Sequence, residues 1–362
     1  MHWLPVILIL PYFFLLLKIY RGLLKVQTFN VSTDPSTYVS VIVACRNEEE
    51  KLPRLLDCIA RQDYPKELFE VIIIDDNSTD KTFEIASGNA VSTNLTVIKN
   101  KGKGKKQAIR TGINTSSGLL IITTDADCRM GDSWIKTIAA FYEKCKPDML
   151  ICPVQLENHP GFFGRFQELE FLSLQGITAG SALSGNGIMC NGANLSFPRE
   201  TYINNMDKLH FELVSGDDIF MLHSLKKEMH SKILWLESAD AVVTTASSST
   251  IWSFLKQRKR WISKGKAYND GYTILIGIIT FVTAVLQLSV IVSAFINPAF
   301  IMPFITIFLL KSIPDLLILM NTSVRYGKKS LMRWFYPAQF VYPFYILSVG
   351  LSSLMPVAGK KN

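Results

Sequence analysis

The sequence predicts an α/β domain with a mostly parallel sheet, joined to α-helical transmembrane segments, one N-terminal and three C-terminal. Between residues 39 and 155, short runs of β-branched and other apolar residues alternate with charged, helix-forming stretches. Such alternation is typical of a parallel sheet that helices cover on both faces. Residues 271–310 and 334–359 contain no charged side chain, which is typical of helices that cross a membrane.

Length and composition indicate the domain organisation. The chain has 362 residues, enough for two or three domains, and it is 48% apolar but only 19% charged. With a mean hydropathy of +0.22, this composition argues against a disordered chain, a coiled coil and an ordinary soluble enzyme. We expect an N-terminal transmembrane anchor in residues 1–24, a cytoplasmic polar domain in residues 25–267 and C-terminal transmembrane helices in residues 268–362.

Four apolar segments are candidates for membrane spans: Trp3–Leu17, Tyr272–Ile296, Ala299–Met320 and Phe335–Val357. The first is short for a span of about 20 residues, but the side chains of Lys18 and Arg21 can extend to the interface. A cleaved signal peptide is the alternative for this segment. No Lys or Arg precedes it and no small-residue cleavage site follows it, so we expect a retained anchor.

Basic residues predict the orientation in the membrane. Clusters of Lys and Arg follow the first span, precede the second, and separate the third from the fourth. The positive-inside rule places all three clusters in the cytoplasm, although Lys360 and Lys361 weakly oppose this. We expect an integral membrane protein of the cell inner membrane or its equivalent. The net charge of +8 is explained by these flanks, so we expect no nucleic-acid partner.

Two features of the membrane part leave alternatives open. Lys311 and Asp315 lie four residues apart on a predicted helix, so they form either a local ion pair or a site for a polar substrate. The segment Gly161–Leu183 mixes Phe and Leu with charged residues. It is either a helix in the bilayer interface or a buried core helix.

Acidic residues follow two of the predicted strands. Asp125 and Asp127 close one apolar strand, and Asp75 and Asp76 follow another. Because ligands bind outside the carboxyl ends of parallel strands, we expect both pairs to share one crevice. Asp125 and Asp127 can hold Mg²⁺ or Mn²⁺, with a solvated turn as the alternative. Asp75 and Asp76 can accept hydrogen bonds from a base or ribose, whereas Ser78–Asp80 is expected to cap a helix.

Two further motifs carry charge. The loop Lys101–Lys106 combines lysines and glycines before a predicted helix, which suits an anion, although a solvated loop is the alternative. Gly216-Asp217-Asp218 precedes another predicted helix. These two carboxylates form either a helix N-cap or a site where one of them is a general base.

The last motif directly precedes the second span. Gln257, Arg260 and Trp261 lie three or four residues apart and can share one helix face. A basic flank of the membrane helix is the alternative explanation for the stretch Gln257–Trp261.

In this order and spacing, the motifs of residues 39–265 resemble those of family 2 glycosyltransferases of the GT-A fold. The segments that carry the resemblance are Val41–Glu49, Asp75–Thr82, Gly104-Lys105 with Ala108 and Gly112, Asp125-x-Asp127, Gly216-Asp217-Asp218 and Gln257-x-x-Arg260-Trp261. The resemblance implies an inverting transfer from a nucleotide-diphospho sugar, with UDP as the commonest nucleotide. Two positions depart from the family pattern: Arg110 replaces a frequent Asn, and Asp217 replaces the usual Glu.

The resemblance also implies roles for individual residues. Glu48 and Asp76 would bind the nucleotide, with Lys105 and Asp125 near the ribose or diphosphate. Asp127 would be the ligand of the metal. Asp218 would be the catalytic base, and the remaining motif residues Asp217, Gln257, Arg260 and Trp261 would border the diphosphate and acceptor.

Three functions are compatible with this sequence. The first is a metal-dependent hexosyltransferase of glycan or cell-envelope biosynthesis that adds one or a few sugars to a lipid or lipid-linked glycan. The second is a processive polysaccharide synthase, which usually carries more spans than the three that follow this domain. The third is a non-catalytic, nucleotide-binding membrane scaffold, which would not need Asp127 and Asp218.

Overall fold

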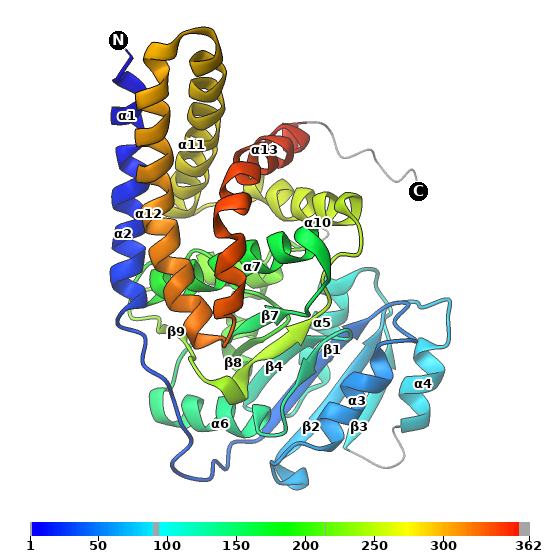
Figure 1. Cartoon of the computed structure of the whole chain (residues 1–362). Coiled ribbons are helices and arrows are strands. Elements are labelled where there is room, and N and C mark those ends of the chain that lie inside the picture. The colour runs from blue at the N-terminus through cyan, green and yellow to red at the C-terminus, as the bar shows by residue number, and fades with distance from the viewer. Residues whose placement is uncertain (1, 90–93, 214, 355–362) are drawn as a thin grey trace. The chain divides into compact units, whose positions relative to one another are not determined.

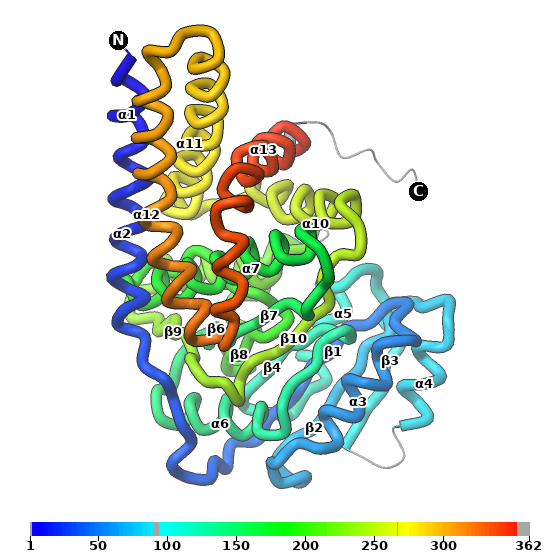
Figure 2. Tube along the Cα trace, in the orientation of Figure 1, coloured from blue at the N-terminus to red at the C-terminus, as the bar shows by residue number. Residues whose placement is uncertain are grey.

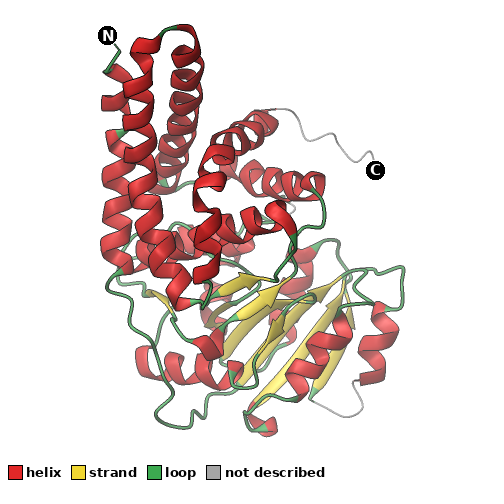
Figure 3. Ribbon diagram, in the orientation of Figure 1, coloured by secondary structure: helices red, strands yellow, loops and turns green. Residues whose placement is uncertain are grey.

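A computed structural model describes residues 2–89, 94–213 and 215–354 of the chain, which forms two compact units. The sheet unit comprises residues 26–157 and 187–246, and the helical unit comprises residues 1–25, 158–186 and 247–362. Figure 3 shows the strands of the sheet unit and the long helices of the helical unit.

The sheet unit is built on a mostly parallel seven-stranded sheet, as the alternating pattern predicts. Its strand order is β3-β2-β1-β4-β8-β6-β9. The four strands β3, β2, β1 and β4 run parallel, whereas β8 is antiparallel to both of its neighbours. The strands of this sheet are β1 (Val39–Cys45), β2 (Phe69–Asp75), β3 (Leu95–Lys99), β4 (Leu120–Asp125), β6 (Met149–Ile151), β8 (Leu195–Pro198) and β9 (Ile233–Trp235). A three-stranded sheet contains β5 (Arg129–Met130), β10 (Val243–Thr245) and β7 (Val154–Leu156).

Helices cover this sheet because its central strands are apolar on both faces. Val41 and Val43 of β1 belong to the same buried cluster as Leu55 and Trp134 from two of the helices. On the other face, Ile42 of β1 lies against α5. The helices of the unit are α3 (Leu52–Ala60), α4 (Thr82–Asn89), α5 (Lys105–Thr115), α6 (Trp134–Cys145), α8 (Arg199–Asn205) and α9 (Asp217–Leu225). Figure 1 shows α3 beside the sheet.

The helical unit contains the predicted membrane helices. Its members are α1 (Leu4–Leu8), α2 (Leu10–Leu23), α7 (Gly161–Leu183), α10 (Ile251–Ser263), α11 (Gly271–Ile296), α12 (Ile301–Arg325) and α13 (Phe335–Leu354). Three helical stretches of the described residues are long and apolar enough to cross a membrane: Leu4–Leu23, Gly271–Ile296 and Pro298–Arg325. Helix α13 covers the fourth predicted span as far as Leu354, and its predicted end at Val357 lies outside the described residues.

The tube in Figure 2 follows α11 into α12 through a tight connection at Asn297 and Pro298. Asn297 accepts a hydrogen bond from the Ala299 amide at 3.0 Å, so its side chain caps the short helix that starts there. This connection falls between the predicted second and third spans, Tyr272–Ile296 and Ala299–Met320.

Helix α7 is a buried core helix of the helical unit rather than a helix on its surface. It packs along α2 and α12, and most of its side chains are buried, including those of Glu168 and Glu170. Glycines permit this approach, since a Cβ on Gly180 would lie 2.3 Å from the carbonyl oxygen of Ile19. Residues of the predicted domain 25–267 are thus divided between the two compact units, because α7 and α10 pack with the membrane helices.

Lys311 and Asp315 belong to a larger buried network. Lys311 pairs with Asp315 at 2.7 Å, and Asp315 accepts hydrogen bonds from Tyr12 at 2.7 Å and from Gln339 at 3.1 Å. Lys311 also donates to Gln339 and lies over the ring of Tyr342. The local ion pair is therefore present, and it joins α2, α12 and α13.

Replacing Gly180 by Ala tests the close contact of α2 with α7. The new methyl group would overlap the backbone of α2, so we expect the free energy of unfolding to fall by about 1–3 kcal/mol. Thermal unfolding of the purified chain in detergent measures this. Gly277→Ala in α11 is the matched control, because no described atom beyond the adjacent residues and the local backbone of its own helix lies within 4 Å of the added Cβ. Equal stability of the two variants would contradict the packing described here.

Candidate functional site

The site begins where three parallel strands end side by side. In the register of the sheet, Cys45 of β1 pairs with Asp75 of β2, and Ala44 pairs with Asp125 of β4. Asp75 and Asp125 therefore flank the carboxyl end of β1. These two strand ends lie at one edge of the sheet, as the sequence pattern predicts, and the shared crevice of both acidic pairs stays a prediction.

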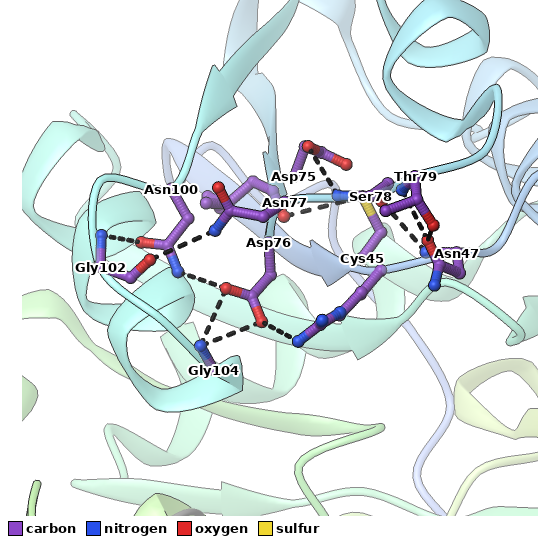
Figure 4. A network of polar contacts seen from close by, with 12 residues as sticks. Cys45, Asn47, Asp75, Asp76, Asn77, Ser78, Thr79, Asn100, Gly102 and Gly104 are labelled. Atoms are coloured by element: carbon purple, nitrogen blue, oxygen red, sulfur yellow. Dashed lines mark hydrogen bonds and ion pairs between the residues drawn. The ribbon is translucent and has the colours of Figure 1, made fainter. Parts of the chain in front are cut away.

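Asp76 connects this edge to the Lys/Gly loop (Figure 4). Its buried carboxylate accepts hydrogen bonds from the Asn100 side chain at 2.7 Å and from the Gly104 amide at 2.8 Å. The guanidinium of Arg46 lies 3.9 Å away. Both oxygens of Asp76 are engaged inside the protein, so this residue fixes the start of α5, which follows Gly104. Its role as a nucleotide ligand stays a prediction.

Asp75 differs from its neighbour because one of its oxygens has no hydrogen-bond partner among the described residues. Its side chain is 3% exposed, and Oδ2 accepts a hydrogen bond from the Ser78 amide at 3.3 Å. Oδ1 is buried without a hydrogen-bond partner among the described residues. A buried acceptor without a donor is costly, so this oxygen can accept a hydrogen bond from a bound ligand.

Lys105 joins the carboxylates of two regions. It stands in the first turn of α5 and forms an ion pair with Asp125, and the two side chains are 42% and 34% exposed. Burial lowers the pKa of Lys105, but the neighbouring carboxylates, Asp125 first among them, together raise it more, so the net shift is upward. Asp217 and Asp218 raise this pKa further, which places them within electrostatic reach of Lys105.

Asp127 and Glu48 extend the acidic side of the site. The Asp127 carboxylate accepts a hydrogen bond from Thr245 at 3.2 Å. Burial and the charge of Asp125 raise the pKa of Asp127 above its ordinary value, although Lys51 and Lys105 oppose the shift. Burial also raises the pKa of Glu48, which pairs with Lys51 at 3.3 Å and is raised further by the charges of Asp127 and Asp125.

Asp218 lies in the first turn of α9, and two backbone amides hold its carboxylate. Its carboxylate accepts hydrogen bonds from Gly192 at 3.2 Å and from Ile219 at 2.8 Å. Burial and the charge of Asp218 raise the pKa of Asp217. The charge of Lys105 lowers the pKa of Asp127, and the charge of Asp218 raises the pKa of Lys105, so both carboxylates lie within electrostatic reach of this lysine.

The residues Gln257, Arg260 and Trp261 lie on α10 of the helical unit. A capping box formed by Thr250 and Ser253 starts this helix. Arg260 is exposed, whereas Gln257 and Trp261 are half-buried. Arg258, which the sequence placed in the basic flank, is instead buried and paired with Glu170. The charge pattern could not show this, because the partner lies 88 residues away.

Some residues of the site carried no signal in the sequence. Thr245, which donates to Asp127, belongs to no motif, and Asn100 precedes the Lys/Gly loop without being part of its pattern. Lys51 could have been found, because it lies three residues after Glu48 at the start of a predicted helix.

The donor set of the acidic edge fits a hard divalent cation. Among the described residues, no group of three or more His, Cys, Asp or Glu side chains could hold a metal ion alone. Asp125 and Asp127 supply two carboxylates, and Mg²⁺ or Mn²⁺ commonly binds through one or two carboxylates together with substrate phosphates. The residues therefore fit a cation that a phosphorylated ligand helps to coordinate.

Comparison with known proteins identifies a domain within the chain. Residues 40–204 match the model of glycosyl transferase family 2. The chain carries a family 2 glycosyltransferase domain. Glycosyltransferase AglE of Haloferax volcanii is 35% identical over 106 residues, which are 29% of this chain and 35% of AglE. The chain therefore spans about a third of that relative.

Two more comparisons cover most of the chain. A dolichyl N-acetyl-α-D-glucosaminyl phosphate 3-β-D-2,3-diacetamido-2,3-dideoxy-β-D-glucuronosyltransferase of Methanococcus voltae is 23% identical over 320 residues, which are 80% of this chain and 95% of that protein. The solved structure of mannosyltransferase PcManGT from Pyrobaculum calidifontis, in complex with GDP-Man and Mn²⁺, has a TM-score of 0.62 at 17% identity. It covers 99% of this chain and 100% of that chain. The likeness supports the predicted GT-A fold with membrane helices.

Asp217→Asn tests the electrostatics of the site. Because the folded state raises the pKa of this carboxyl, its ionised form destabilises the fold at neutral pH. We expect Asp217→Asn to unfold at a higher temperature than the wild type at pH 7. The gain should start to shrink as the pH falls through the raised folded pKa, and it should vanish below the ordinary pKa of Asp, where the carboxyl is neutral in both the folded and the unfolded state. Asp240→Asn, at an exposed position of the same unit, is the control, and a lower melting temperature of Asp217→Asn than of this control would contradict the argument.

Proposed function

We propose that this chain is an inverting, metal-dependent glycosyltransferase. It moves a sugar from a nucleotide-diphospho sugar, most commonly a UDP-sugar, to a lipid or lipid-linked glycan at the cytoplasmic face of a membrane. The observation that carries the proposal is the ion pair of Lys105 with Asp125 at the end of β4, with the charges of Asp217 and Asp218 near enough to raise the pKa of Lys105. The lipid-linked substrate named for the Methanococcus relative supports this class of acceptor.

The donor would bind at the ends of the strands. The unpartnered oxygen of Asp75 accepts a hydrogen bond from the base, and Glu48 lies at the same edge of the sheet. Asp76 holds the Lys/Gly loop in place, so that Lys105 and the first amides of α5 face the diphosphate. Lys105 stays charged, because its pKa is raised, and it neutralises charge on the leaving diphosphate.

A divalent cation held by Asp127 and Asp125 would supply further neutralisation of the diphosphate when bound. The complex of PcManGT with GDP-Man and Mn²⁺ supports this cofactor, with Mg²⁺ or Mn²⁺ as the candidates. The raised pKa of Asp127 follows from its burial and from the charge of Asp125, and a bound cation would offset that repulsion.

Asp218 would act as the base. Two backbone amides orient its carboxylate, so one oxygen can accept the proton of the acceptor hydroxyl while that hydroxyl attacks the anomeric carbon. Attack opposite the leaving diphosphate inverts the anomeric centre. A glycosidase needs a second carboxylate to protonate its leaving group, whereas a neutralised diphosphate leaves without this help.

The acceptor would approach from the membrane. Gln257, Arg260 and Trp261 precede α11 in the chain, and they border the diphosphate and acceptor in this proposal. The basic clusters beside the spans favour a cytoplasmic catalytic domain. The short set of membrane helices after the domain favours addition of one or a few sugars over polymer extrusion.

Replacing the base tests the reaction. We expect Asp218→Asn to lower transfer about 10²–10⁴-fold, with little change in donor binding, because the amide cannot take the proton. Turnover of a panel of nucleotide sugars by the purified chain with membrane lipids, followed by mass spectrometry of the product, measures this. Normal transfer by the variant would refute the base. A long polymer would favour the processive synthase, and a wild type that turns over no donor would favour the scaffold.

Replacing the proposed metal ligand tests the cofactor. We expect Asp127→Asn to weaken Mn²⁺ binding at least about tenfold and EDTA to stop transfer by the wild type. Because burial raises the pKa of Asp127, protons compete with Mn²⁺ at a higher pH than at an ordinary carboxylate, so affinity should fall as the solution is acidified. Calorimetric titration with Mn²⁺ across a pH series measures both effects. Asp240→Asn is the control, and equal Mn²⁺ affinity of the two variants would remove Asp127 from the site.

A further inference from the structure

Arg258 is a buried cation on α10, between the residues Gln257, Arg260 and Trp261 that we call the signature. Its side chain is 4% exposed, and that of its partner Glu170 on α7 is 6% exposed. The guanidinium donates to both oxygens of Glu170, from Nε at 3.0 Å and from Nη2. Glu170 also accepts a hydrogen bond from Tyr345 of α13 at 2.9 Å. Such a two-pronged contact fixes the plane of the guanidinium.

Arg258 also contacts two of the three signature residues. Its Nη1 donates to Oε1 of Gln257, and its guanidinium carbon lies 4.1 Å from the ring centre of Trp261. Phe254 stacks at 4.5 Å, so the guanidinium lies against two aromatic rings of its own helix. Contacts of a cation with ring faces at these distances are attractive.

The contact with Gln257 determines which group this side chain presents. A guanidinium has only donors, so the Gln257 atom that faces it must be the carbonyl oxygen. The amide nitrogen of Gln257 is then the group left to donate. Gln257 is thereby set as a hydrogen-bond donor, which suits an oxygen-rich ligand such as a phosphate or a sugar.

Neither lysine in place of Arg258 nor glutamine in place of Glu170 would give the same arrangement. Lysine is a point charge that cannot donate to Glu170 and Gln257 in fixed directions or stack flat on Trp261. Replacing Glu170 by Gln leaves a buried guanidinium without its counter-charge. The arrangement of Gln257 and Trp261 thus depends on a buried ion pair between α10 and α7.

We propose that Arg258, fixed by Glu170, is a positioning residue of the transferase: it sets Gln257 as a donor and orients the ring of Trp261. The inference rests on the proposed function only in assigning Gln257 and Trp261 to substrate. Arg258 itself acts through these neighbours, and its own nitrogens are engaged with Glu170 and Gln257.

Helix α7 offers a matched control. Glu168 is as buried as Glu170, and it pairs with Arg165 at 2.8 Å and with Lys328 at 2.9 Å. Neither partner belongs to α10. Glu168→Gln therefore removes an equivalent buried charge from the same helix without touching the signature.

The first experiment compares donor turnover by the purified full chain. We expect Arg258→Lys and Glu170→Gln to lower kcat at least tenfold with donor KM changed less than threefold, and Glu168→Gln to stay within threefold of the wild type. In a background that carries both Gln257→Ala and Trp261→Ala, Arg258→Lys should lower kcat less than threefold further, because its effect acts through these two residues. Melting temperature and gel filtration identify folded protein. Equal losses in Glu168→Gln and Arg258→Lys would overturn the proposal.

The second experiment needs no turnover. The difference in acrylamide quenching between a protein and its Trp261→Phe variant isolates the fluorescence of Trp261. We expect this quenching to rise at least twofold when Arg258→Lys is introduced. Unchanged Trp261 quenching in folded Arg258→Lys would refute the positioning role. If the wild type turned over no donor, the proposed function would fail, and the quenching result would still decide this inference.

Discussion

The candidate site depends on the ammonium group of Lys105, which interacts with two groups of carboxylates. Asp125 and Asp127 follow β4, while Asp217 and Asp218 start α9, and each pair contains charges that repel. Lys105 pairs directly with the first group and attracts the second. Its place in the first turn of α5 is fixed in turn by Asp76, which binds the amide of Gly104. The conformation of the Lys/Gly loop therefore determines where the positive charge of Lys105 lies relative to the acidic groups.

The edge of the sheet could be predicted because it follows from local patterns. Apolar strands that alternate with helices imply a parallel sheet, and parallel strands bring their carboxyl ends together. The residues that follow those strands, such as Asp75 and Asp125, were therefore assigned to one edge before any contact was known. The cap at Asp80 was predictable for a similar reason, since its side chain accepts from the amide of Thr82, two residues ahead.

The remaining contacts could not be predicted because they join residues that are distant in sequence. Asp76 binds an Asn100 side chain 24 residues ahead, and this depends on the register of β2 with β3. The buried oxygen of Asp75 that has no hydrogen-bond partner among the described residues can be identified only from the structure. Arg258 has the composition of a basic membrane flank, and only the position of Glu170 on α7 shows that its charge is buried. A run of basic residues predicts side chains that face water or lipid headgroups. It therefore does not reveal an arginine that is buried and paired with a carboxylate.

The hydrogen bond between Tyr12 and Asp315 spans 303 residues and gives the helical unit an unusual assembly problem. Helix α2, which carries Tyr12, is synthesised long before Asp315, and the whole sheet unit is translated between them. During that interval the phenol of Tyr12 lacks its native acceptor, and only the arrival of α12 and α13 supplies Asp315 and Gln339. Completion of the membrane helices is therefore a late event of biogenesis, which joins the two ends of the chain after the catalytic domain has had time to fold.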